Sequence, residues 1–181
     1  NLCQCDFIRK YSAYGKKQRE VMYQLIDLYS LFYIKHVIND NSQDPHKWSN
    51  MIDSGSRKAW SGYAFEQVCL LHLPQIKKKL GIDTISTDVC SWQNDNAQID
   101  LIIDRRDRII NLCEMKYCDK PFSVTKSYLA KMEQRRECFA EATSATKALH
   151  LTLIAPYGIA NNSQSVKIQS VVNMDDLFKT V

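Results

Sequence analysis

The sequence predicts a mixed α/β fold in which a helix, three strands, a second helix and a further strand follow one another. Two observations lead to this prediction. The spacing of apolar residues changes from helical to alternating after Gly81, which indicates a change from helices to strands. The segments 98–104 and 108–117 are apolar on both faces, which is typical of strands that are covered on both sides. We therefore expect a mixed central sheet, preceded by a small helical segment.

Helices are expected over much of the first 80 residues. Two rows of apolar residues in the segment 20–39 predict a well-buried helix, and the turn-forming residues 39–45 end it. The segment 58–73 has helical spacing again, and 76–81 predicts a short helix that ends at a glycine. We expect residues 1–57 to form the preceding helical segment and residues 58–181 to form the α/β domain.

Strands and helices alternate in the remaining sequence. A hairpin loop at 105–107 is expected to join two adjacent strands. The expected strands are 83–92, 98–104, 108–117, 148–156 and 166–172, and the expected helices are 125–146 and 174–178.

The composition is that of an ordinary globular protein. The 181 residues are 45% hydrophobic and 24% charged, with a formal net charge of +4, which excludes collagen-like, low-complexity and wholly disordered chains. No window approaches the roughly 18 consecutive apolar residues of a membrane helix, so we expect no membrane partner. The mildly basic charge permits a nucleic acid as partner without requiring one.

The seven cysteines predict neither a disulfide framework nor a zinc site. Their number is odd, and several lie in apolar runs, where a thiol behaves as a small hydrophobic group. Cys3 and Cys5 lack the spacing of a zinc knuckle, and no matching His or Cys pair follows. No signal-peptide pattern opens the sequence, so we expect a cytoplasmic location. Because the sequence begins at Asn1 rather than Met, we expect it to be a piece of a longer protein.

Charged residues interrupt the predicted strands where apolar residues would be expected. Asp100 opens one apolar run, and Glu114 and Lys116 interrupt the next. Burying a charge costs several kcal/mol unless the charge is paired or binds a metal. Strand alternation places Glu114 and Lys116 on one face, and a hairpin would place Asp100 beside Glu114. These residues therefore predict either a metal site or an ion pair that supports the sheet.

A carboxylate pair with a lysine suits the hydrolysis of a phosphodiester. Asp100 and Glu114 would hold Mg²⁺ or Mn²⁺, which lowers the pKa of a bound water and offsets the developing charge. Lys116 would orient that water or stabilise the transition state as a fixed cation. Glu66, on the helix before the sheet, is the expected third metal ligand and fourth catalytic residue, and a glutamate on the helix surface is the alternative.

Two basic residues on the long helix are candidate contacts to nucleic acid. Lys131 and Arg135 lie four residues apart and therefore share a helix face. They could contact phosphates, and the alternative is an ordinary solvated surface.

Glu66, Asp100 and the run Glu114-Met115-Lys116 together resemble the motif of the PD-(D/E)xK nuclease superfamily. The expected order of elements matches the core of that superfamily, although Ile99 stands where its name has proline. The resemblance implies a restriction-endonuclease-like core, Mg²⁺ or Mn²⁺ as cofactor, and metal-dependent cleavage of DNA.

A narrower resemblance runs from about Phe7 to the end of the sequence. The segments 23–33, 60–66, 98–104 and 113–117 resemble the C-terminal region of a family of archaeal and bacterial AAA+ type ATPases. In that family an ATPase domain and a winged-helix segment precede a nuclease-like domain of unknown function. The resemblance implies those upstream domains as partners within one longer chain, and no P-loop sequence occurs in these 181 residues. The alternative function is a catalytically silent nuclease-fold module that binds DNA, or docks to the ATPase and regulates it.

Overall fold

A five-stranded mixed sheet forms the centre of the computed structural model, which describes residues 2–16 and 21–180. Its strands lie in the order β3-β4-β5-β6-β7, with β3 antiparallel to β4, β4 antiparallel to β5, and the last three parallel to one another. The strands are β3 (Thr87–Gln93), β4 (Gln98–Arg105), β5 (Ile109–Met115), β6 (Ala148–Ile154) and β7 (Ser170–Val172). The predicted mixed α/β fold is therefore confirmed, and the architecture is consistent with a restriction-endonuclease-like core.

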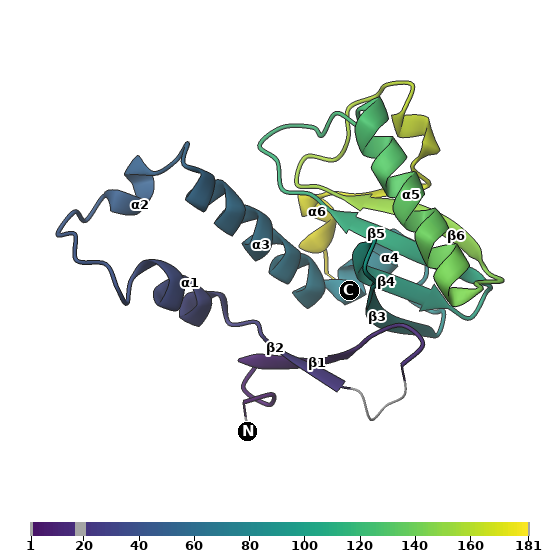
Figure 1. Cartoon of the computed structure of the whole chain (residues 1–181), viewed down its shortest axis with the longest axis horizontal. Coiled ribbons are helices and arrows are strands. Elements are labelled where there is room, and N and C mark those ends of the chain that lie inside the picture. Colours follow the sequence, from purple (N-terminus) through teal and green to yellow (C-terminus); the bar gives the residue numbers. More distant parts are fainter. Residues whose placement is uncertain (1, 17–20, 181) are drawn as a thin grey trace.

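Helices cover both faces of this sheet (Figure 1). One face packs against α5 (Lys126–Thr143), which contributes Leu129, Met132 and Phe139 to the core. The opposite face packs against α3 (Gly55–Leu71), α4 (Leu73–Lys79) and α6 (Met174–Leu177). This double cover explains why the central strands are apolar on both faces.

Helix ends follow local signals in the sequence. The side chain of Thr125 accepts a hydrogen bond from the backbone N–H of Tyr128 (3.2 Å) at the start of α5, and Ser54 caps α3 in the same way. Ser144 takes a left-handed conformation (φ 50°) and ends α5. The long helix therefore begins close to its predicted start and ends slightly earlier.

The N-terminal segment differs from the prediction. A single helix was expected over residues 20–39, but β1 (Ile8–Ser12) and β2 (Val21–Leu25) form an antiparallel hairpin. Helix α1 (Leu28–His36) begins only after Asp27, whose carboxylate accepts a hydrogen bond from the backbone N–H of Ser30 (2.7 Å). Residue 20 lies outside the described residues. The apolar rows of this segment fit a strand as well as a helix. The partner strand β1 ends nine positions before β2 begins, so the pairing that decides between the two is not visible within the segment itself.

The predicted burial of this helix was also wrong. No residue of α1 is buried, and Tyr29 is 75% exposed. Helices α1 and α2 (Lys47–Asn50) lie beyond α3, away from the sheet (Figure 1). The ring of Phe32 on α1 packs edge-on against Trp48 and Trp60, with centroid distances of 4.8 and 5.4 Å. The division of the chain after residue 57 stays a prediction.

The last predicted strand is shorter than expected. Residues 166–172 were expected to form one strand, but a 3₁₀ turn (Ser165–Lys167) precedes the three-residue β7. The side chain of Asn162 accepts hydrogen bonds from the backbone N–H groups of Gln164 and Ser165, both at 2.9 Å, which fixes this turn. Within residues 2–16 and 21–180, no helix has the length and apolar character needed to cross a membrane.

Candidate functional site

The predicted hairpin brings Asp100 and Glu114 to neighbouring positions. Leu101 on β4 lies opposite Cys113 on β5. The next positions outward along this antiparallel register are Asp100 and Glu114. Two carboxylates therefore lie at neighbouring positions at the end of the sheet where β4 begins and β5 ends.

A β-bulge in β4 sets the direction of Asp100. Cys90 on β3 lies opposite Ile102, whereas Trp92 lies opposite Ile99. Between these two pairs β3 has one residue, Ser91, whereas β4 has two, Asp100 and Leu101. β4 therefore carries one extra residue at this point. Bulges re-aim side chains and occur frequently beside active sites. Asp100 is accordingly exposed between two buried neighbours, and it accepts a hydrogen bond from the side-chain amide of Gln98 (2.6 Å).

Helix α3 brings Glu66 to the same end of the sheet. The preceding residue, Phe65, is buried in one core cluster with Met115, and its ring centroid lies 6.0 Å from that of Tyr117. Glu66 is therefore held close to the end of β5, where Lys116 follows.

The other three predicted catalytic residues act electrostatically on Glu66. Burial, followed by the charges of Asp100 and Glu114, raises the pKa of Glu66 to about 7, while the charge of Lys116 acts in the opposite direction. Lys116 itself is exposed, and its backbone N–H donates to the carbonyl of Ile154 (2.8 Å), which fixes the chain beyond the end of β5. The structure thus brings Glu66, Asp100, Glu114 and Lys116 into one neighbourhood.

Both carboxylate oxygens of Glu114 have partners on α5. The hydroxyl of Tyr128 donates to Oε1 (2.7 Å), and Nη1 of Arg135 forms an ion pair with Oε2. Burial, and then the charge of Glu114, raise the pKa of the Tyr128 hydroxyl. Arg135 is therefore bound to a predicted metal ligand in this arrangement, whereas Lys131, one turn earlier on α5, is exposed.

Sequence reasoning missed Tyr128 and the pairing of Arg135 with Glu114. The two α5 residues are seven positions apart, so they lie on one face two turns apart. That spacing indicates a shared face, but only the docking of α5 on the sheet places Glu114 against it.

The donor set has the chemistry of a hard-cation site, because Mg²⁺ and Mn²⁺ prefer carboxylate oxygens. The donors are nevertheless not assembled around one point. Among the side chains of residues 2–16 and 21–180, no three Asp, Glu, His or Cys groups are gathered so that they could hold a metal ion as they stand. Glu114, one of the donors, is hydrogen-bonded to Tyr128 and ion-paired with Arg135 in this arrangement.

Comparison with known proteins relates this region to one family. The family model DUF234, described as archaea bacterial proteins of unknown function, matches residues 32–138. That range includes every predicted site residue. No curated protein and no solved structure matches the chain.

Proposed function

The chain belongs to the DUF234 family of archaeal and bacterial proteins of unknown function, and we propose that its α/β domain is a metal-dependent nuclease that cleaves phosphodiester bonds of DNA. The observation that supports this most strongly is the convergence of Glu66, Asp100, Glu114 and Lys116 at one end of the sheet. Their order along the chain also resembles the PD-(D/E)xK motif.

Each residue of the cluster has a distinct part in the proposed reaction. Asp100, Glu114 and Glu66 would hold Mg²⁺ or Mn²⁺, which when bound supplies an activated water and neutralises charge on the phosphate. The half-buried carboxyl of Glu66 is repelled by its two acidic neighbours, so a cation between them would favour its ionised form. Lys116 would stabilise the negative charge that develops on the phosphate.

The ion pair between Arg135 and Glu114 suggests how this site changes on binding. The guanidinium of Arg135 neutralises Glu114 when no cation is bound. A divalent cation on Glu114 would displace Arg135, and the freed guanidinium could then contact a DNA phosphate together with Lys131. On this proposal Arg135 exchanges one anionic partner for another.

The test of the proposed metal site is a thermal melt with and without millimolar Mn²⁺. A ligand at 100 times its Kd adds about 2.7 kcal/mol of stability, which raises the Tm of a chain of this size by about 5–10 °C. We expect this shift in the wild type and in the control Glu137→Gln, which removes an exposed carboxylate of α5. We expect no shift in Glu114→Gln. An equal shift in Glu114→Gln would show that the cation binds elsewhere and would sink the proposed site.

Replacing Arg135 by glutamine is expected to strengthen Mn²⁺ binding. The reason is that Arg135 competes with the cation for Oε2 of Glu114. The half-saturating Mn²⁺ concentration, measured from the Tm shift, should fall several-fold. Lys131→Gln removes one charge from the same helix without touching Glu114, and it should bind Mn²⁺ almost as the wild type does. If both variants behave alike, competition for Glu114 plays no part.

The capping of Glu114 also favours a second candidate function. Because Tyr128 and Arg135 satisfy both carboxylate oxygens without a metal, the same geometry suits a nuclease-fold module without catalytic activity. Such a module would bind DNA, or dock to ATPase and winged-helix domains upstream in a longer chain and regulate them. It predicts no Mn²⁺ shift in any variant and, at most, salt-sensitive DNA binding.

A further inference from the structure

We infer that the N-terminal hairpin adds a DNA-binding residue, Arg9, to the candidate site. This inference rests on the proposed function, because it adds a contact between Arg9 and the DNA that the proposed nuclease site would bind. Arg9 lies outside both the residues that match the family model and the predicted motif.

The hairpin is attached to the sheet, which defines where Arg9 lies. Ala13 forms a parallel bridge with Ser91 on β3, and the backbone N–H of Tyr14 donates to the carbonyl of Ser91 (2.7 Å). The ring of Tyr14 packs edge-on against Phe139, with centroids 4.9 Å apart. The chain just after β1 is therefore attached to the free edge of β3, and β3 in turn pairs with β4, the strand that carries Asp100 (Figure 1).

The guanidinium of Arg9 is held in place by its neighbours on the hairpin. Its Nε donates to the side-chain oxygen of Gln24 (2.9 Å), the residue directly opposite it on β2. The guanidinium carbon lies 5.0 Å from the ring centroid of Tyr11. These contacts restrict its rotamers before any ligand binds, which lowers the entropy cost of binding.

The charge of Arg9 lies near the candidate site. Burial lowers the pKa of Arg9, and electrostatic interactions with its neighbours Tyr11, Tyr63 and Asp100 act in the opposite direction. Asp100 is a proposed metal ligand, and Tyr63 lies one helical turn before Glu66 on α3.

Arg9 is half-buried but takes part in none of the ion pairs between described residues. Arg57 and Arg136 are also half-buried and take part in no ion pair between described residues, whereas Arg105, Arg106 and Arg135 each pair with a carboxylate. A partly desolvated cation without an anionic partner is costly, and an anionic ligand offsets that cost. The planar guanidinium fork fits the oxygens of a phosphate particularly well. A phosphate group is therefore the ligand that this arrangement suits best.

The position of Arg9 points to a substrate with several phosphates. The carboxylates and Lys116 would act on the phosphate that is cleaved, whereas Arg9 approaches from the hairpin on the β3 side. A polynucleotide supplies a second phosphate for Arg9, and a small phosphodiester does not. Arg9 is thus a substrate-binding residue that favours DNA over small diesters.

The experiment measures binding of a fluorescent DNA duplex by anisotropy over a series of salt concentrations, with Ca²⁺ present. Arg9→Ala is expected to weaken binding roughly tenfold and to reduce the slope of log K against log salt by about 1. Arg9→Lys keeps the charge and should restore the slope, which separates lost charge from lost folding. The matched control is Lys10→Ala, since Lys10 is the exposed neighbour on the opposite face of β1. It should bind almost as the wild type does.

The outcomes separate this inference from the proposed function. Equal weakening in Arg9→Ala and Lys10→Ala, or no DNA binding by the wild type, would overturn the inference. If Arg9→Ala alone loses affinity but Mn²⁺ shifts no variant, the inference stands and the nuclease proposal fails. If the wild type cleaves DNA, Arg9→Ala should lose activity on DNA but keep its hydrolysis of bis(p-nitrophenyl) phosphate. A matching loss on that small diester would contradict the assigned role.

Discussion

Replacing Lys116 by alanine is expected to lower the rate of metal-dependent DNA cleavage by about 10²–10³-fold, the usual cost of removing one group that stabilises charge in a transition state. The side chain is exposed beyond the end of β5, so its loss should leave the fold intact. Lys116 is a cation and not a metal ligand, so the Mn²⁺-dependent rise in Tm should persist in this variant. The measurement is the rate of cleavage of supercoiled plasmid in Mg²⁺ or Mn²⁺.

A matched control for this experiment is Lys120→Ala. Lys120 is also an exposed lysine, four residues further along the loop that leaves β5. The control should cleave DNA at nearly the wild-type rate. Cleavage that persists unchanged in Lys116→Ala would remove Lys116 from the proposed catalytic set, and with it the resemblance of the site to a nuclease motif.

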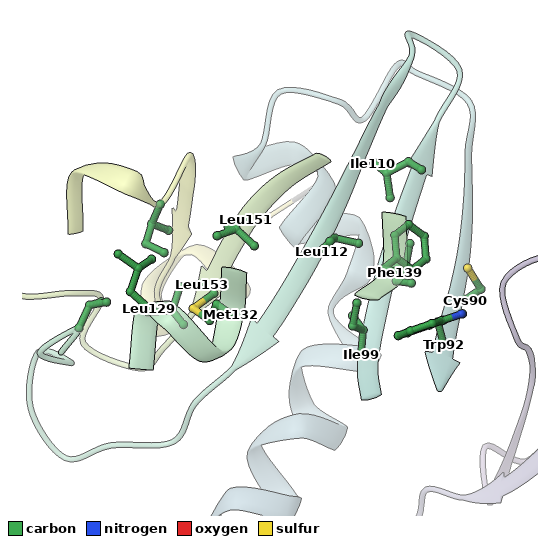
Figure 2. Packing of buried hydrophobic residues seen from close by; sticks show 13 residues of the cluster. Cys90, Trp92, Ile99, Ile110, Leu112, Leu129, Met132, Phe139, Leu151 and Leu153 are labelled. Carbon is green, nitrogen blue, oxygen red and sulfur yellow. The ribbon is translucent and has the colours of Figure 1, made fainter. Parts of the chain in front are cut away.

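Replacing Phe139 by alanine is expected to reduce the free energy of unfolding by about 3–5 kcal/mol. Phe139 is fully buried in the core between α5 and the sheet, on the side of the cluster where Trp92 lies (Figure 2). Its ring lies edge-on to Trp92 on β3, at a centroid distance of 5.4 Å, and also contacts Tyr14 after the hairpin strand β1. The substitution therefore leaves a cavity where three segments of the chain meet. Urea denaturation followed by tryptophan fluorescence measures the loss.

Two further variants calibrate this result. Val166→Ala truncates a side chain that is 81% exposed, and it should change the stability by no more than about 0.5 kcal/mol. Ile110→Val removes one methyl group from the same core cluster and should cost about 0.5–1.5 kcal/mol, which gives a measurable effect if Phe139→Ala does not fold. A loss below 1 kcal/mol in a folded Phe139→Ala would contradict the described packing of α5.

The central strands and the long helix could be predicted from the sequence because their signals are local. The segment 98–104 is apolar on both faces, and Thr125 marks the start of α5 as its N-cap. Such patterns depend on burial and on hydrogen bonds within a few residues, and these leave a readable period in the sequence. The N-terminal hairpin lacked such a signal, because β2 is stabilised by pairing with β1 across an intervening loop.

The sequence by itself determined the α/β class, because the spacing of apolar residues distinguishes helices from strands. It also identified the candidate catalytic residues, because a charged residue within an apolar run is visible without knowledge of the fold. Tertiary structure decided what surrounds those residues. It placed Tyr128 and Arg135 on Glu114, and it brought Arg9 into electrostatic interaction with Asp100. These contacts join segments that are far apart along the chain, and they depend on how α5 and the hairpin dock on the sheet. Docking is set by packing between elements, which no local pattern of residues records.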